Sequence, residues 1–146
     1  MSFSEIQQKV FELIKNQDQT VVDHFALAKS VDGYKGDIPA YFQKCNAAFL
    51  SNFTLQGFPE VFRTRALFHN LFISTYLAPY NQYAQEILDT DSNLYKFDPK
   101  IIYLVIDSAG SDSKQITELV DFLIVKTRSS IVVAYDGVLD NLPDNN

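Results

Sequence analysis

Three short polar segments hold the residues of this sequence that could do chemistry, and each one follows an apolar run. They are SNFT at residues 51–54, APYNQY at residues 78–83 and DSAGSD at residues 107–112. Hydroxyl, amide and carboxylate groups can bind a polar ligand, and a hydroxyl can act as a nucleophile when a base lies within hydrogen-bond reach. The candidate ligand-binding residues are Ser51, Asn52, Thr54, Tyr80, Asn81, Gln82, Tyr83, Asp107 and Ser108, of which Ser51 and Thr54 are also the candidate nucleophiles.

The apolar runs predict the strands of a parallel sheet. Strand-like runs begin at AAFLS, LFISTYL, KIIYLVI and SIVVAY, and segments with helical spacing of apolar residues separate them. Unbroken apolar strands that alternate with helices indicate an α/β fold, a three-layer α/β/α sandwich with a parallel sheet of about four strands. The carboxyl ends of parallel strands meet at one edge of the sheet, so we expect the three polar segments to lie together there.

Two helices are predicted ahead of this sheet. The first has apolar residues at helical spacing from Ile6 to Ile14, and the second is expected from Thr20 to Val31 with an apolar face that includes Val22 and Phe25. A connector with two glycines and a proline follows them. We therefore expect a helical N-terminal segment over residues 1–45, an α/β domain over 46–140 and a frayed tail over 141–146.

Composition argues against several classes of protein. The chain has 146 residues and a formal net charge of -6, without the cluster of basic residues that a nucleic-acid phosphate backbone requires. No apolar run approaches the roughly 20 residues that span a bilayer. The single cysteine permits no internal disulfide or thiolate metal cluster, and the N-terminus does not resemble a signal peptide. We expect a cytoplasmic protein without a metal site in this domain, and the sequence leaves a homo-oligomer open.

Two longer stretches resemble a known family. AAFLSNFTLQGF at residues 47–58 and LAPYNQYAQEILDTDSNLYKFDPKIIYLVID at residues 77–107 are similar to the N-terminal region of the FkbH-like family, which belongs to subfamily IIIC of the haloacid-dehalogenase (HAD) superfamily. The family pattern there is close to L-S-N-F-T, then A-P-Y-N-Q-Y-x-Q-E-I-L-D, then a strand that ends in Leu-Asp. The resemblance is strong over residues 44–107 and weak on either side.

The resemblance implies both a fold and a function. It implies a flavodoxin-like domain similar to the SGNH hydrolases, which in this family precedes a HAD-type domain that would use Mg. Such proteins are implicated in loading a glycerate-derived acyl unit onto an acyl carrier protein. This chain contains no D-x-D-x-T motif of a HAD domain. We therefore expect an accessory or binding domain that is not catalytic alone, has no cofactor of its own, and binds an acyl carrier protein or its pantetheine-linked substrate.

The resemblance also allows a second function, an SGNH-type ester or thioester hydrolase or acyltransferase that acts through Ser51 or Thr54. That fold places a Gly-Asp-Ser after its first strand, whereas Phe53 falls at the nucleophile position here. The two histidines, His24 and His69, lie outside the predicted strand ends, and we expect them to be ordinary surface or half-buried residues. A carrier protein is usually acidic, so its docking would need local cations such as Arg63, Arg65 or Lys100.

Each candidate residue also has an ordinary structural explanation. Ser51, Asn52 and Thr54 could cap the helix after the first strand, and Asp107 could be the turn residue that ends the third. The tyrosines of residues 78–83 could pack over the edge of the sheet. We expect Ile87 and Leu88 to anchor the following helix and to leave residues 80–83 facing a ligand. A receiver domain and a P-loop are excluded, because the first strand is followed neither by an acidic pair nor by a glycine-rich turn.

Overall fold

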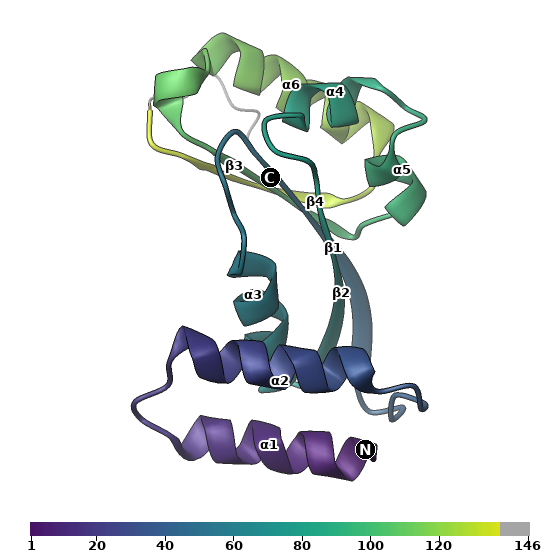
Figure 1. Cartoon of the computed structure of the whole chain (residues 1–146). Helices are drawn as coiled ribbons and strands as arrows, with labels where there is room; N and C mark the ends of the chain where they lie inside the picture. Colours follow the sequence, from purple (N-terminus) through teal and green to yellow (C-terminus); the bar gives the residue numbers. More distant parts are fainter. Residues whose placement is uncertain (138–146) are drawn as a thin grey trace. The chain divides into compact units, whose positions relative to one another are not determined.

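The computed structural model describes residues 1–137 and contains a four-stranded parallel sheet (Figure 1). Its strands are β1 (Gln43–Ser51), β2 (Leu71–Leu77), β3 (Ile101–Ile106) and β4 (Ser130–Tyr135), in the spatial order β2-β1-β3-β4. The register of β1 on β3 runs from Ala47 opposite Ile101 to Ser51 opposite Val105. The chain adds strands on one side of β1 and then on the other, so the strand order switches between β1 and β3. The predicted α/β fold is confirmed.

Contacts along the chain divide it into two compact units, which we describe separately. The helical unit comprises Met1–Cys45 and Gln56–Ser74, and the sheet unit comprises Asn46–Leu55 and the chain from Thr75 onward. The predicted frayed tail lies outside the described residues. None of the helices within residues 1–137 is both long enough and apolar enough to cross a membrane.

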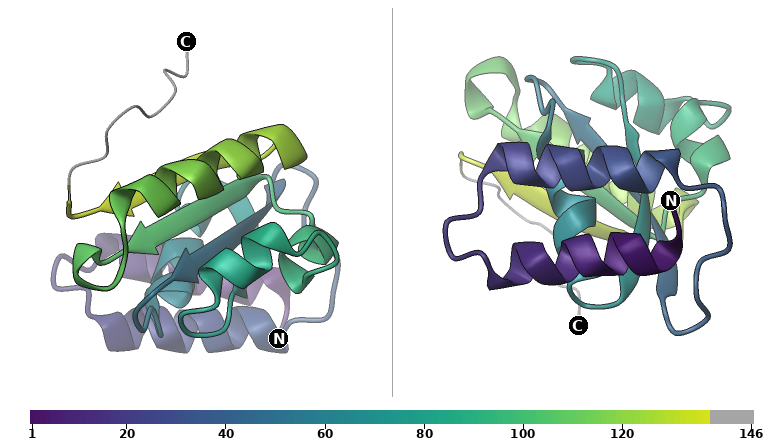
Figure 2. Two further views of the ribbon diagram at one scale, coloured as in Figure 1. Left: turned by 90° about the horizontal axis from the view of Figure 1, so that it is seen from above. Right: turned by 60° about the horizontal axis from the view of Figure 1, so that its bottom comes forward.

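The core of the sheet unit lies between the strands and the helices α4 (Tyr83–Leu88), α5 (Asn93–Phe97) and α6 (Ser113–Lys126). Alternate residues of β1 and β3 enter this core, because successive strand side chains point to opposite faces of a sheet. Figure 2 shows α6 extended along the sheet. Ala47 and Phe49 belong to the other face of β1 and are also fully buried, so this strand is covered on both sides. The residues of the core are Ala48, Leu50, Ala78, Tyr83, Ile87, Leu94, Ile102, Leu104, Ile106, Ile116, Leu119, Val120 and Leu123.

The helical unit contains α1 (Phe3–Lys15), α2 (Val21–Gly33) and α3 (Phe58–Leu67). α1 and α2 lie side by side (Figure 2), and each begins with a capping box, formed by Ser2 with Glu5 and by Thr20 with Asp23. α3 follows Gly57, whose φ of 89° is a left-handed conformation that favours glycine. The buried residues of this core are Phe3, Ile6, Val10, Leu13, Leu27, Phe42 and Leu67.

The apolar face expected for α2, which also included Val21, Ala26 and Ala28, is correct only at Ala28. Val22 and Phe25 are exposed, whereas His24, Leu27 and Ala28 form the buried face. His24 tolerates burial because its Nδ1 lies 2.8 Å from the hydroxyl oxygen of Thr64 on α3. The same finding corrects the expectation that His24 is a surface or half-buried residue. Sequence spacing alone cannot reveal a polar partner 40 residues away.

Two short elements were not predicted. α5 has five residues and no apolar periodicity, and a 3-10 helix, η1 (Ser108–Gly110), follows β3 inside a segment expected to be a loop. The expected helices after β1, β2 and β3 are all present as α3, α4 and α6. The strands and the longer helices therefore follow from the pattern of apolar residues, and the short elements do not.

Candidate functional site

Asn52 joins the loop after β1 to the loop after β3. Its Nδ2 donates to the backbone oxygen of Asp107 at 2.7 Å, and its Oδ1 accepts from the backbone nitrogen of the same residue at 2.8 Å. A Cβ on Gly110 would lie 3.2 Å from Nδ2 of Asn52, so the glycine permits a close approach of η1. The paired bonds hold the carboxyl ends of β1 and β3 together at the point where the strand order switches.

Two carboxylates extend this network to the end of β4. Asp107 Oδ1 accepts from the backbone nitrogen of Ala109 at 2.9 Å, at the start of η1. Asp136 Oδ1 accepts from the backbone nitrogen of Ser108 at 2.6 Å. This bond favours the ionised carboxylate and holds the pKa of Asp136 below its ordinary value. Side chains from the ends of β1 and β4 thus hold the backbone of the loop after β3 in a fixed position.

A cleft of about 580 Å³ lies beside this network, and we call it the β3–β4 cleft. Its volume falls within the range of about 300–1,000 Å³ that is common for small-molecule sites. Aliphatic residues of β3 and β4 line it together with the partly exposed ring of Phe53, and two carboxylates lie among its lining residues. The cleft therefore combines an apolar surface with a few polar groups. Its lining residues are Phe53, Val105, Ile106, Asp107, Val133, Ala134, Tyr135 and Asp136.

The two candidate nucleophiles differ in exposure. Ser51 is only 5% exposed, and its hydroxyl oxygen accepts from the backbone nitrogen of Phe53 at 3.1 Å, whereas Thr54 is exposed. Neither residue caps α3, because that helix begins after Gly57, so the capping explanation is wrong for both. The sheet unit contains no histidine, since His24 and His69 both belong to the helical unit. No hydroxyl–imidazole pair can form within the sheet unit.

The segment at residues 78–83 differs from expectation at its end. Tyr83 is 5% exposed and packs in the core, and burial raises the pKa of its phenol. Leu88 is 56% exposed, so Ile87 anchors α4 and Leu88 does not. α4 begins at Tyr83, which places Tyr83, Glu86 and Ile87 on one helix face. Pro79, Tyr80, Asn81 and Gln82 of this segment remain exposed, and Asn81 adopts a left-handed φ of 53°.

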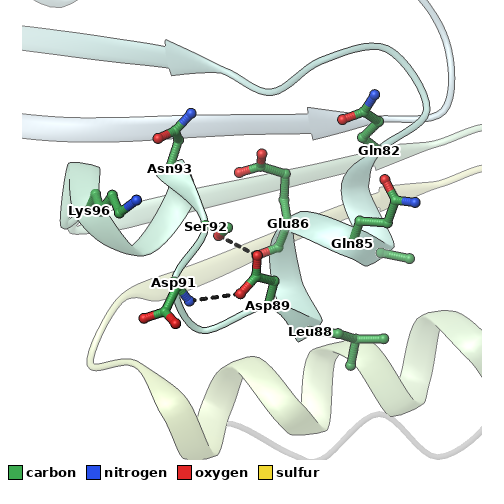
Figure 3. Close-up of a pocket in the computed structure, with 10 residues that line it drawn as sticks. Gln82, Gln85, Glu86, Leu88, Asp89, Asp91, Ser92, Asn93 and Lys96 are labelled. Carbon is green, nitrogen blue, oxygen red and sulfur yellow. Dashed lines mark hydrogen bonds between the residues drawn. The ribbon is translucent and has the colours of Figure 1, made fainter.

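The polar residues that follow hold α4 and α5 together. Glu86 is buried, and its Oε2 accepts from the hydroxyl of Tyr76 at 3.1 Å and from the backbone nitrogen of Leu94 at 3.0 Å. Ser92 Oγ donates to the backbone oxygen of Glu86 at 2.6 Å (Figure 3). Burial and the Glu86 carboxylate raise the pKa of Tyr76 to about 12. These polar side chains stabilise the turn between two short helices, which explains their place in the sequence without a ligand.

An open, polar pocket lies over the same two helices (Figure 3). Its volume is about 810 Å³, and amide and carboxylate side chains account for most of its lining. Asp89 Oδ1 accepts from the backbone nitrogen of Asp91 at 3.0 Å, so part of this lining is also engaged in the turn. The lining residues are Gln82, Ala84, Gln85, Glu86, Leu88, Asp89, Asp91, Ser92, Asn93 and Lys96.

The structure brings some of the candidate residues together and leaves others apart. Asn52, Asp107 and Ser108 form one hydrogen-bonded group beside the β3–β4 cleft. Residues 80–82 follow β2, which β1 separates from β3 in the sheet. No described hydrogen bond links them to that group. Sequence reasoning missed Asp136, although it follows the fourth strand just as Asp107 follows the third.

The residues present do not form an evident metal site. Within residues 1–137, no group of three or more His, Cys, Asp or Glu side chains is arranged to hold a metal ion. The carboxylates of the site instead accept hydrogen bonds from backbone nitrogens. The side chains that line the cleft offer hydrogen bonding and apolar contact.

Comparisons with known proteins support the fold. No protein-family model matches the chain, and no curated protein matches it significantly. A solved structure with a TM-score of 0.56 and 17% identity is the N-terminal part of the protein BF1531 from Bacteroides fragilis, described as containing a phosphatase domain and as complexed with Mg. The match covers 96% of this chain but only 35% of that one. The chain thus has the fold of part of a larger protein that contains a phosphatase domain.

Proposed function

We propose that this chain is the N-terminal accessory domain of an FkbH-like enzyme and binds the pantetheine-linked acyl group of a carrier protein in the β3–β4 cleft. The likeness of residues 47–58 and 77–107 to that family supports this proposal, as does the fold shared with part of a phosphatase-containing protein. The observation that carries it is a cleft of about 580 Å³ beside the Asn52–Asp107 bonds. Ligands of open α/β sheets bind at this edge of the sheet.

The chemistry of the cleft matches such a ligand. The pantetheine arm carries geminal methyl groups, which would contact the side chains of Val105 and Ala134, a pair of neighbours on one face of the sheet. Its two amides would hydrogen-bond to the rim of the cleft. A glycerate-derived acyl unit carries hydroxyl groups, which can donate to the carboxylates of Asp107 and Asp136. Both carboxylates would repel a phosphate, so the phosphate of the arm would remain outside the cleft.

Binding is favoured over hydrolysis by the surroundings of the candidate nucleophiles. Ser51 is buried, its oxygen already accepts a backbone hydrogen bond, and the sheet unit supplies no histidine base. We expect no hydrolysis of p-nitrophenyl esters above that of Ser51→Ala and Thr54→Ala variants. Turnover that either substitution abolishes would instead support the hydrolase alternative.

Binding can be tested by NMR with the isotopically labelled chain. Titration with a pantetheine-bearing carrier protein should shift the amide signals of Phe53, Asp107 and Ala134. Ala134→Phe would fill the cleft and should suppress these shifts, whereas Ala26→Phe, an equal change at an exposed position of α2, should not. Absence of shifts at millimolar carrier, or equal shifts in both variants, would contradict the proposal.

A further inference from the structure

An apolar groove runs along α1 in the helical unit. Its volume is about 190 Å³, and apolar side chains make up most of its walls together with two amides. The lining residues are Phe3, Ile6, Gln7, Val10, Phe11 and Ile14 of α1 with Phe42, Leu67, Phe68 and Asn70. No charged residue lines it. Phe3 and Leu67 belong to the buried core, so the groove is an opening in the surface of that core. Its floor is consequently fixed by the packing of the unit itself.

Two apolar side chains of α1 at the edge of this groove remain in solvent. Phe11 is 62% exposed and Ile14 is 45% exposed, one helical turn apart. The core already receives Phe3, Ile6, Val10 and Leu13 from the same helix, so folding does not need either exposed side chain. Neighbouring exposed apolar residues beside a groove are typical of a surface that binds another protein.

Two cations lie over aromatic rings that line the groove. The Nζ of Lys15 lies 5.0 Å from the ring centre of Phe11. The guanidinium carbon of Arg65 lies 5.3 Å from the ring centre of Phe68. Arg65 donates to the side-chain oxygen of Gln19, and the contacts described for the two cations within residues 1–137 include no carboxylate. Arg63, by contrast, forms an ion pair with Asp32 at 2.7 Å. Two cations thus lie beside aromatic residues of the groove on a chain whose net charge is -6.

We propose that this groove binds an acidic amphipathic helix of the carrier protein. The identity of the partner rests on the function proposed above, whereas the chemistry of the helix follows from the groove. Apolar side chains spaced by three or four residues would enter between Phe11 and Phe68, as in other helix-in-groove complexes. Carboxylates on the flanks of that helix would meet Lys15 and Arg65, and such complementary charges fix orientation and speed association.

The test is a titration of the full chain with a carrier protein that lacks the pantetheine arm. We expect amide shifts along α1 and near Phe68, and binding that weakens as salt rises, because salt screens exposed charges. The double variant Lys15→Glu and Arg65→Glu should weaken binding about tenfold, since exposed charges each contribute modestly. Lys29→Glu introduces a similar charge reversal on an exposed part of α2 and should have little effect.

A second pair of variants tests the apolar part of the groove. Phe11→Ser should weaken binding several-fold, whereas Val22→Ser, a change at an exposed residue of α2, should leave it unchanged. Equal affinity of all variants would overturn the proposal. So would sedimentation that shows the chain alone to form a dimer that Phe11→Ser disrupts, because a second copy would then occupy the groove.

The two proposals fail in different ways. If the carrier without its arm binds and the Phe11 variant weakens it, the groove is confirmed even when the pantetheine-bearing carrier causes no shifts in the β3–β4 cleft. If only the pantetheine-bearing carrier binds, with shifts confined to the cleft, the groove is not its docking site and the proposed function stands.

Discussion

Asn52 has the most constrained side chain at the carboxyl edge of the sheet. Both ends of its amide are used by the backbone of Asp107, so neither a carboxylate nor a hydroxyl could replace it with the same pair of bonds. The Asn in the L-S-N-F-T pattern is thereby explained by the positions of two strand ends. The cleft beside it depends on that geometry.

The Asn52→Ala variant should unfold more easily than the wild type. It loses two hydrogen bonds, and we expect the free energy of unfolding to fall by about 1–2 kcal/mol. Urea denaturation measures this change, and amide shifts at Asp107 and Ala109 would report the released loop. Asn93→Ala replaces an exposed asparagine of α5 and should change stability by less than about 0.5 kcal/mol. Equal stability of the two variants would show that the paired bonds contribute nothing.

His24 should make the stability of the chain depend on pH. Burial, together with the nearby Arg65 charge, lowers the pKa of His24 below its ordinary value of 6.5, against a smaller opposing effect of Asp23. The unfolded chain therefore binds a proton more readily than the folded chain. The free energy of unfolding should be constant above about pH 7 and should fall as the pH drops through 6.5.

Urea denaturation between pH 7 and pH 5 checks this dependence. His24→Gln should flatten it, whereas His69→Gln, at an exposed position, should leave it unchanged. Asp23 and Asp136 have lowered pKa values, so their contribution to the free energy of unfolding is lost only at a lower pH than that of His24. The two effects therefore occur in separate pH ranges. A wild-type curve that is flat from pH 7 to pH 5 would contradict the burial of a neutral His24.

At the scale of elements, α4 and α5 are stable only as a pair. They have six and five residues, and helices this short are not stable alone in water. Glu86 bonds to Tyr76 on β2 and to the backbone of Leu94, so one carboxylate connects β2, α4 and α5. The polar signature of residues 81–92 therefore contributes to structure as well as to any surface it presents.

Glu86→Ala should destabilise the chain by about 2–3 kcal/mol, because it leaves a buried hydroxyl and a backbone nitrogen without an acceptor. Glu86→Gln should lower the free energy of unfolding by less, since its amide oxygen can still accept from the Tyr76 hydroxyl and the Leu94 backbone nitrogen. Denaturation in urea measures the difference. A glutamine variant less stable than the alanine variant would contradict this account of the bonds.

The regular elements of the fold could be predicted because their signal is local. β3 is a continuous apolar run with alternate residues buried, and α6 begins at Ser113, directly after its N-cap Asp112. α5 could not be predicted, because five residues show no period. The apolar face predicted for α2 differs from its buried face for another reason. Its burial depends on Thr64 of α3, a contact that local spacing does not contain.

The candidate site was predictable only in part. The rule that parallel strands end at one edge led to Asn52 and Asp107, which indeed bond to each other. The same rule does not say which residues of the helix after β2 face the sheet. Tyr83 was therefore predicted to face a ligand, although it packs in the core. Each residue of a helix is rotated by about 100° from the one before it, so a small error in register moves the buried face. Tyr83 is buried and Leu88 is exposed, the reverse of the expected arrangement.

At the scale of the whole molecule, the N-terminal helices are required by the core they form. Phe3, Ile6, Val10, Leu13 and Leu27 make up most of the buried residues that surround Phe42 and Leu67 in the helical unit. A chain that begins at Tyr41 would expose these last two residues. We expect it to lose its cooperative thermal transition and to aggregate, as light scattering would show. A monomer with a sharp transition would contradict this view of the unit.

Binding of the acyl-pantetheine group in the β3–β4 cleft can be measured by isothermal titration calorimetry. Glyceryl-pantetheine, free of carrier protein, is titrated into the wild-type chain, into Ala134→Phe and into Ala26→Phe. We expect saturable binding to the wild type and to Ala26→Phe, and at least tenfold weaker binding to Ala134→Phe, whose side chain fills the cleft. Binding of equal affinity to all three proteins, or to none of them, would contradict it.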